Sequence, residues 1–248
     1  MKRCFPLFLL AFVAAGCPLP YTPPTPVDAF KKYGQVTGTK YYMYVPSYYS
    51  EDRDWPLVIT LHASLLWDGP LRQVKEWKYY AEKHGLVVIA PSLGSAEGIL
   101  PTFNWQGRLR GDERNVLAIL DEVCTNYRID RKAVLLTGFS AGGYPMYYIG
   151  LRNPDRFNML ISRGGNSSMK IFDKLKLSES ARKMPIMIFW GKDDEFTDSD
   201  GWRAFRWLRQ NGVKTARMKK VKGGHLRRPD TAYYYWRPYL PMRHRMER

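Results

Sequence analysis

The sequence is poor in cysteine and histidine, and this scarcity excludes several kinds of site. Only three cysteines and four histidines occur among its 248 residues. They form no Cys-x-x-Cys pair and no His/Cys cluster, so neither a metal site nor a cofactor is expected. Beyond residue 16 the chain lacks the roughly 20-residue apolar run that a transmembrane helix needs. It also contains no recognisable nucleic-acid-binding module, so nucleic acid is not an expected partner.

The first 16 residues have the pattern of an export signal. A basic start is followed by the apolar run 5–15 and then by small residues, which is typical of a secretory signal peptide. Residues 14–17, Ala-Ala-Gly-Cys, resemble the lipobox of bacterial lipoproteins, and this resemblance implies cleavage after Gly16 and a lipid on Cys17. A protein of this type is anchored to a bacterial membrane in the cell envelope. Secretion without a lipid is the alternative.

A proline-rich segment separates this signal from the rest of the chain. Residues 17–29 contain five prolines, which favour an extended tether without a packed core. The folded domain is therefore expected to span residues 30–248, a length that suits a single α/β domain. Because Cys124 falls on the apolar face of a predicted helix, it is expected to be a core residue.

Strand-like and helix-like segments alternate over about 200 residues. Apolar or β-branched runs predict strands at 40–47, 56–63, 86–91, 132–139, 157–165, 185–191 and 215–221. Helical spacing predicts helices at 70–85, 112–127, 142–152 and 199–212, with Asp112 as an N-cap. This alternation predicts an α/β fold with a mostly parallel central sheet and helices on both faces. The short segment between residues 165 and 185 leaves no room for a large lid.

One short motif points to chemistry at the end of a predicted strand. Residues 138–142, Gly-Phe-Ser-Ala-Gly, match the pattern G-x-S-x-G and lie between a buried strand and a helix. In that setting the glycines allow a sharp turn that exposes the serine hydroxyl, so Ser140 is a candidate nucleophile. A serine that merely caps a helix is the alternative. The N–H group of Ala141, directly after the nucleophile, is a candidate oxyanion-hole donor.

A serine hydroxyl needs a base to accept its proton, and the base needs an orienting carboxylate. His225 follows the last predicted strand in a glycine-rich loop, and we assign it as the base. The loop after the strand 185–191 offers three acids, Asp193, Asp194 and Glu195. The order Ser140, acid, His225 is the one described for hydrolases that carry this motif.

These segments together resemble the α/β-hydrolases, in particular the secreted group that includes feruloyl esterases, acetylxylan esterases and polyhydroxybutyrate depolymerases. The resemblance extends over residues 38–225 and is carried by residues 61–64 (LHAS), 111–157, 189–196 (FWGKDDEF) and 223–225 (GGH). The G-x-x-D pattern of that family, placed on residues 191–194, implies Asp194 as the acid, with Asp193 as the alternative.

The resemblance also implies a second oxyanion donor in the LHAS segment, where the family has a His-Gly pair. Ala63 replaces that glycine, and the glycine-rich continuation is missing. Ser64 is the first candidate donor, and Leu65 and Ala63 are the alternatives. Aromatic residues in 65–69 and 101–108, together with Trp190, either flank the cleft or pack inside the fold.

The leading functional prediction is an exported serine hydrolase, a carboxylesterase that cleaves an acylated polysaccharide or a small ester through an acyl-enzyme. A serine peptidase of the same fold is one alternative. A degenerate hydrolase that binds a surface without catalysis is another. The altered LHAS segment and the basic C-terminal region motivate this last reading, since residues 203–248 carry 14 Lys or Arg against two acids.

Overall fold

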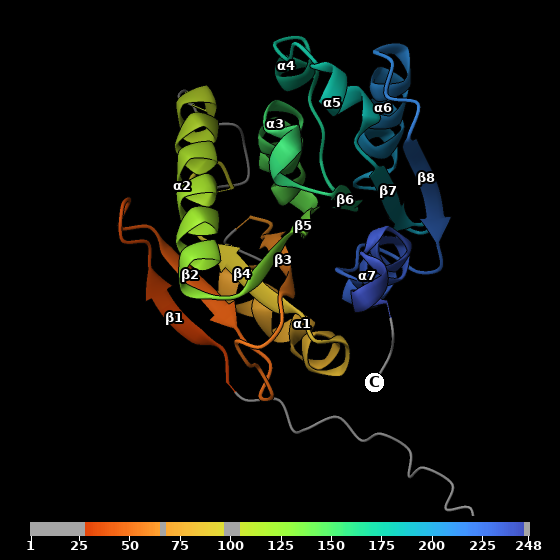
Figure 1. The fold of residues 1–248 in the computed structure, drawn as a ribbon. Coiled ribbons are helices and arrows are strands. Elements are labelled where there is room, and N and C mark those ends of the chain that lie inside the picture. Colours follow the sequence, from red (N-terminus) through yellow and green to blue (C-terminus); the bar gives the residue numbers. More distant parts are fainter. Residues whose placement is uncertain (1–27, 65–67, 97–104, 246–248) are drawn as a thin grey trace, which may run out of the picture.

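The computed structural model describes residues 28–64, 68–96 and 105–245 (Figure 1). The predicted signal peptide, Cys17 and all but residues 28 and 29 of the predicted tether lie outside these ranges. Within them, no helix has the length and apolar character needed to cross a membrane.

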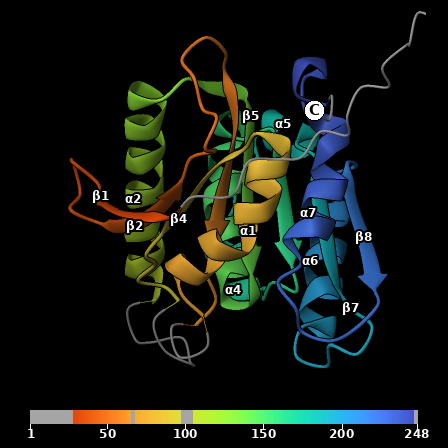
Figure 2. The ribbon, with the colours of Figure 1, turned by 90° about the horizontal axis from the view of Figure 1, so that it is seen from below.

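An eight-stranded sheet forms the centre of the described part. Its spatial order is β1-β2-β4-β3-β5-β6-β7-β8; β1 and β2 pair antiparallel, as do β2 and β4, and the remaining pairs are parallel. The strands are β1 (Phe30–Tyr33), β2 (Lys40–Tyr44), β3 (Trp55–Leu61), β4 (Val87–Pro91), β5 (Ile129–Phe139), β6 (Met159–Arg163), β7 (Ile186–Gly191) and β8 (Ala216–Val221). Figure 2 shows them side by side, from β1 at one edge to β8 at the other.

Helices cover both faces of this sheet (Figure 1). One face is packed by α2, α3 and α6, and the opposite face by α1 and α7. The helices are α1 (Pro70–His84), α2 (Trp105–Asn126), α3 (Gly143–Arg152), α4 (Met169–Phe172), α5 (Glu179–Lys183), α6 (Asp198–Gln210) and α7 (Pro229–Trp236).

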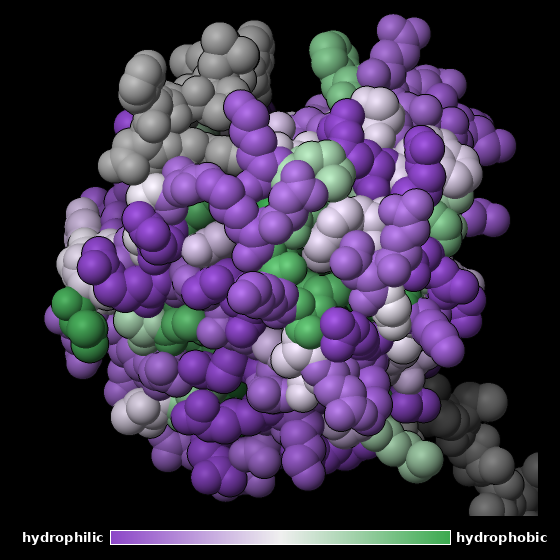
Figure 3. All heavy atoms as spheres, turned by 90° about the horizontal axis from the view of Figure 1, so that it is seen from above, coloured by the Kyte–Doolittle hydropathy of each residue, from purple (hydrophilic) through white to green (hydrophobic). Residues whose placement is uncertain are grey.

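Burial on both faces explains the unbroken apolar runs of the central strands. In β3, for example, Ile59 belongs to the core beneath α2 and α3, whereas its neighbour Val58 belongs to the core beneath α1. The surface seen in Figure 3 is dominated by hydrophilic residues, with hydrophobic ones in small separate groups, as expected for a face exposed to water. The predicted α/β fold with a mostly parallel sheet is confirmed.

The structure differs from the sequence predictions at two points. The edge strand β1 is not among the predicted strands, because its sequence Phe-Lys-Lys-Tyr contains two lysines and little apolar character. Asp112 does not cap a helix, because α2 begins seven residues earlier. Its buried carboxylate instead accepts hydrogen bonds from the backbone N–H groups of Gly94 (2.8 Å) and Ser95 (3.0 Å) and so caps a neighbouring loop.

Candidate active site

Ser140 occupies a strained turn at the carboxyl end of β5. Its φ of 51° places a non-glycine residue in the left-handed region, an arrangement that the surroundings must enforce. A single 3₁₀ turn, Ser140–Gly142, connects β5 to α3. A Cβ at Gly138 would lie 2.3 Å from the Gly142 carbonyl oxygen, and one at Gly142 would lie 2.4 Å from the Leu61 carbonyl oxygen. The turn therefore requires glycine at both positions and leaves Ser140 half-buried.

His225 and Asp194 form a hydrogen-bonded pair beside this turn. Asp194 follows β7 and is only 2% exposed, and its Oδ2 atom lies 2.8 Å from His225 Nδ1, in the loop after β8. Thr197 donates to the same oxygen through Oγ1 (2.6 Å), and the backbone N–H groups of Phe196 and Thr197 donate to Oδ1. Because a carboxylate only accepts, Nδ1 carries the proton and Nε2 is the basic nitrogen.

The loop that follows β6 brings the serine turn and this pair together. The N–H group of Asn166 donates to the Ser140 carbonyl oxygen (2.8 Å), and a Cβ at Gly164 would lie 3.3 Å from His225 Nδ1. The ring of Phe139, next to Ser140, has its centroid 4.7 Å from that of His225. Among the described residues, His225 bonds to Asp194, and no hydrogen bond joins it to the Ser140 hydroxyl. In hydrolases without substrate the distance between nucleophile and base is often long, and the bond forms when substrate binds.

The structure brings Asp194, and not Asp193, to His225. Asp193 is exposed, whereas Asp194 is buried and is the acid bonded to His225. Glu195 is also exposed. The difference follows from the tight turn after β7, in which the Asp194 N–H group donates to the Gly191 carbonyl oxygen (3.2 Å) and the two residues between them are exposed.

The LHAS segment lies against the serine turn, as the contact between Gly142 and Leu61 shows. His62 is fully buried and braces this segment: its Nε2 accepts from the Leu93 N–H group (3.1 Å), and its Nδ1 therefore donates to the Ala63 carbonyl oxygen (2.6 Å). The N–H group of Ala63 already donates to Asp68 Oδ2 (3.0 Å). Of the three predicted donors, Ser64 is half-buried and Leu65 lies outside the described residues.

A buried arginine beneath the site was missed by the sequence analysis. The guanidinium of Arg163, at the end of β6, is fully buried and donates to the hydroxyls of Thr60 (2.8 Å) and Thr137 (2.9 Å). Burial lowers the pKa of Arg163 to about 10, although the charges of Asp68 and Glu76 act in the opposite direction. The only indication of this network in the sequence is a charged residue inside the apolar run 157–165, and no sequence pattern predicts which residues it contacts.

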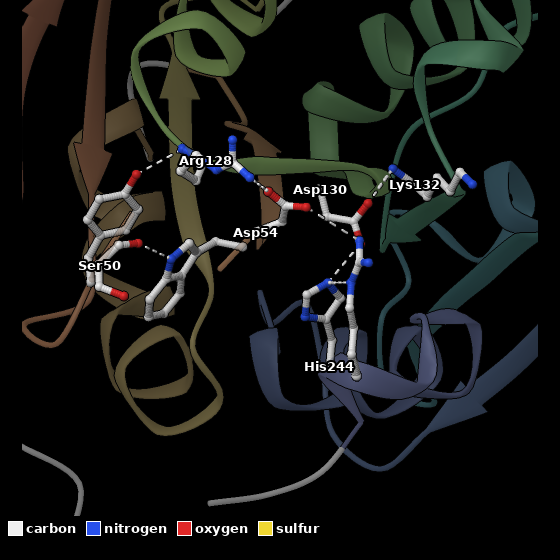
Figure 4. A network of polar contacts seen from close by, with 9 residues as sticks. Ser50, Asp54, Arg128, Asp130, Lys132 and His244 are labelled. Atoms are coloured by element: carbon white, nitrogen blue, oxygen red, sulfur yellow. Dashed lines mark hydrogen bonds and ion pairs between the residues drawn. The ribbon is translucent and has the colours of Figure 1, made fainter. Parts of the chain in front are cut away.

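The remaining histidines do not reach this site. His84 is the last residue of α1, and its ring stacks on the ring of Tyr233 in α7, with 4.0 Å between the ring centroids. His244 Nε2 lies 2.8 Å from the buried Asp130 Oδ2 (Figure 4). Asp130 stands near the start of β5 and Ser140 follows its end, so about ten residues at about 3.3 Å each place them about 30 Å apart.

Burial decides between the two alternatives for Trp190. Trp190 does not flank a cleft, because it is 2% exposed and its Nε1 donates to Asp198 Oδ1 (2.7 Å). In the part of the chain that the structure describes, no cluster of three or more His, Cys, Asp or Glu side chains is arranged to hold a metal ion. The described site therefore consists of the serine turn, the His225–Asp194 pair and the LHAS segment.

Known proteins share both sequence and fold with this chain. The profile of the prolyl oligopeptidase family matches residues 76–196. A bifunctional acetylxylan esterase/xylanase, XynS20E of Neocallimastix patriciarum, is 25% identical over 206 residues, which cover 82% of this chain and 29% of that protein. The chain therefore spans less than a third of the length of this relative.

Solved structures show the same fold at lower identity. A ferulic acid esterase of Anaeromyces mucronatus, AmCE1/Fae1A, solved with ferulic acid, is 18% identical, with a TM-score of 0.64 over 88% of this chain and 90% of the esterase. A thermostable esterase is 21% identical, with a TM-score of 0.59 over 87% of this chain and 60% of that one.

The sheet order, the serine turn and these solved structures define the fold: the chain has the α/β-hydrolase fold. It resembles esterases in sequence and in fold, and both the predicted fold and the predicted resemblance are confirmed. These relatives are described as an acetylxylan esterase/xylanase, a ferulic acid esterase and a thermostable esterase.

Proposed function

We propose that the protein is an exported carboxylesterase in which Ser140, His225 and Asp194 form a catalytic triad. The observation that carries the proposal is the strained Ser140 turn beside the His225–Asp194 pair. Ser140 Oγ attacks the ester carbonyl carbon while His225 Nε2 takes the hydroxyl proton. The alcohol then leaves with that proton, and an acyl-enzyme remains. Water, deprotonated by His225, attacks the acyl carbon, and His225 returns that proton to Ser140 Oγ as the acid leaves.

The developing negative charge on the carbonyl oxygen needs two N–H donors. We assign these to Ala141, at the start of the 3₁₀ turn that precedes α3, and to Ser64 in the LHAS segment. Because α3 begins at Gly143, two residues after Ala141, the positive end of its dipole lies near this N–H group and favours an oxyanion there. Asp194 keeps the proton on His225 Nδ1, which leaves Nε2 free to act as the base.

The proposed substrate is an acylated polysaccharide or a small ester. Its support is the likeness to proteins described as an acetylxylan esterase/xylanase and a ferulic acid esterase. The pattern of residues 1–16 supports export, and the lipobox-like Cys17 supports a lipid anchor. Incorporation of a labelled fatty acid into the wild type but not into Cys17→Ser would test the anchor.

Covalent labelling tests the proposed nucleophile independently of the substrate. We expect a fluorophosphonate probe to add one phosphonyl group to the wild type, localised to Ser140 by peptide mass spectrometry. The variant Ser140→Ala should remain unlabelled. Labelling of Ser140→Ala at the wild-type rate would contradict the proposal.

A serine peptidase is the second candidate, since the prolyl oligopeptidase family profile matches residues 76–196. An amide is a poorer acyl donor than an ester, so matched ester and anilide substrates with the same acyl group separate the two functions. We expect turnover of the ester to exceed that of the anilide and of peptides. The reverse order would favour the peptidase.

A non-catalytic surface-binding protein is the third candidate. The engagement of the Ala63 N–H group by Asp68 and the basic region 203–248 favour it. Salt-sensitive binding of an anionic polymer by a protein that neither reacts with the fluorophosphonate nor hydrolyses any ester would support it.

A further inference from the structure

Arg163 is the centre of a buried polar network that touches two sides of the candidate site. A fully buried cation is costly unless every donor finds a partner. Here Nε donates to Thr137 Oγ1 (2.9 Å), Nη2 donates to Thr60 Oγ1 (2.8 Å) and Gln73 Oε1 (2.7 Å), and Nη1 donates to the Arg227 carbonyl oxygen (2.9 Å). These partners come from β3, β5, α1 and the loop after β8, so one side chain joins four elements.

One arm of the network leads from Arg163 to the LHAS segment. Gln73, which is fully buried on α1, receives Arg163 at its Oε1 and donates from its Nε2 to Asp68 Oδ2 (2.6 Å). The same carboxylate oxygen accepts the Ala63 N–H group (3.0 Å), one residue before the proposed donor Ser64. Asp68 also donates its own N–H group to the Ser64 carbonyl oxygen (3.0 Å). The orientation of this segment is thus set by Asp68, and Asp68 is held by Gln73.

The other arm leads from Arg163 to the loop that carries His225. The Arg227 carbonyl oxygen accepts from Arg163, two residues beyond His225. The Arg227 guanidinium returns to the first arm, with its Nε 3.5 Å from Asp68 Oδ1 and 3.0 Å from Glu76 Oε1. It also lies over the Phe139 ring, 5.5 Å from the centroid, on which His225 packs. The network therefore closes into a ring beneath the site.

We propose that Asp68, Gln73 and Arg163 are positioning residues that fix the LHAS segment relative to the His225 loop. The proposal rests on the proposed function, because it assigns these two segments an oxyanion donor and the base. Residues 62–64 and the loop around His225 lie outside the helices and strands, so hydrogen bonds help to define their positions. Misplacement of catalytic groups by about 1 Å can cost about 100-fold in rate, which gives a buried network of this kind a catalytic consequence.

The test compares kcat and KM for p-nitrophenyl acetate in Gln73→Leu and the wild type. Leucine has a similar volume but neither holds Asp68 nor accepts from Arg163. We expect kcat to fall about 10- to 100-fold with KM within about threefold of the wild type, because the lost interaction acts on the oxyanion and not on the bound ester. The matched control is Tyr44→Phe, which removes a buried hydrogen bond to Glu82 at the other end of α1 and should leave kcat unchanged.

A second pair of variants covers the case in which Gln73→Leu does not fold. Thr60→Val removes the hydroxyl that joins Arg163 and Gln73 at constant shape, whereas Thr60→Ser keeps it. We expect Thr60→Val to lower kcat several-fold and Thr60→Ser to recover most of the loss. Wild-type kcat in folded Gln73→Leu, or equal kcat in the two Thr60 variants, would overturn the positioning role. Absence of ester turnover in the wild type would instead refute the proposed function.

Discussion

Asp194 Oδ2 lies 2.8 Å from His225 Nδ1 and accepts a second hydrogen bond from Thr197 Oγ1 at 2.6 Å. Together with the two backbone donors to Oδ1, these contacts occupy both oxygens of a carboxylate that is 2% exposed. A carboxylate fixed in this way can hold the histidine in one tautomer and one orientation. The relationship also separates Asp194 from its neighbour Asp193, which the sequence alone left as an alternative.

The two aspartates form a matched pair of test positions. Asp194→Asn keeps the shape of the side chain but lets His225 protonate on the wrong nitrogen, so we expect kcat to fall by about 10⁴-fold. Asp193→Asn removes one exposed charge and should leave kcat within about twofold of the wild type. Steady-state hydrolysis of p-nitrophenyl acetate measures both. Equal losses in the two variants would contradict the assignment of Asp194.

The close approach of Gly142 to Leu61 predicts a severe effect of one added methyl group. In Gly142→Ala the new Cβ would start 2.4 Å from a backbone carbonyl oxygen, and overpacking of this kind costs about 1–3 kcal/mol in the free energy of unfolding. The displaced LHAS segment should also lower kcat.

Gly111→Ala is the control for this substitution. A Cβ at Gly111 meets no atom within 4 Å, and the residue lies inside α2. Because alanine favours a helix more than glycine does, we expect the free energy of unfolding of Gly111→Ala to rise by about 1 kcal/mol. Urea unfolding measures both variants. A Gly142→Ala protein as stable as the wild type would show that the turn is less tightly packed than described.

The pair of His244 and Asp130 predicts a stability change with pH (Figure 4). Burial lowers the pKa of His244 below its ordinary value of 6.5, although the Asp130 carboxylate favours the charged form. The unfolded chain therefore binds a proton at higher pH than the folded protein does. The free energy of unfolding should fall as the pH drops from about 6.5 through the lower folded pKa.

His244→Gln isolates this contribution, because glutamine can still donate to Asp130 but does not titrate. Urea unfolding between about pH 7.5 and about pH 5.5 should show a smaller loss of stability in the variant than in the wild type. Asp130 does not interfere in this range. Burial raises its pKa, but hydrogen bonds from Lys132, His244 and Arg243 outweigh that effect and hold it below 3.8. Parallel pH profiles of the two proteins would contradict the assignment.

The sequence predicted the sheet and the serine turn because both depend on local patterns. Apolar runs such as that of β7 define buried strands, and Gly138 and Gly142 mark two places where the turn passes close to neighbouring backbone. Trp190 lies inside such a run, which is why it packs in the core. The network around Arg163 could not be predicted in this way, because its hydrogen bonds join residues that are up to 103 positions apart.

The role of Ser140 is tested most directly by the rate of ester hydrolysis in Ser140→Ala. We expect the wild type to hydrolyse p-nitrophenyl acetate with a burst of p-nitrophenol, the sign of an accumulating acyl-enzyme. The folded Ser140→Ala protein should show no burst and a rate lower by about 10⁴-fold or more. A Ser140→Ala protein that hydrolyses the ester at the wild-type rate, with the same burst, would contradict the assignment of Ser140 as the nucleophile.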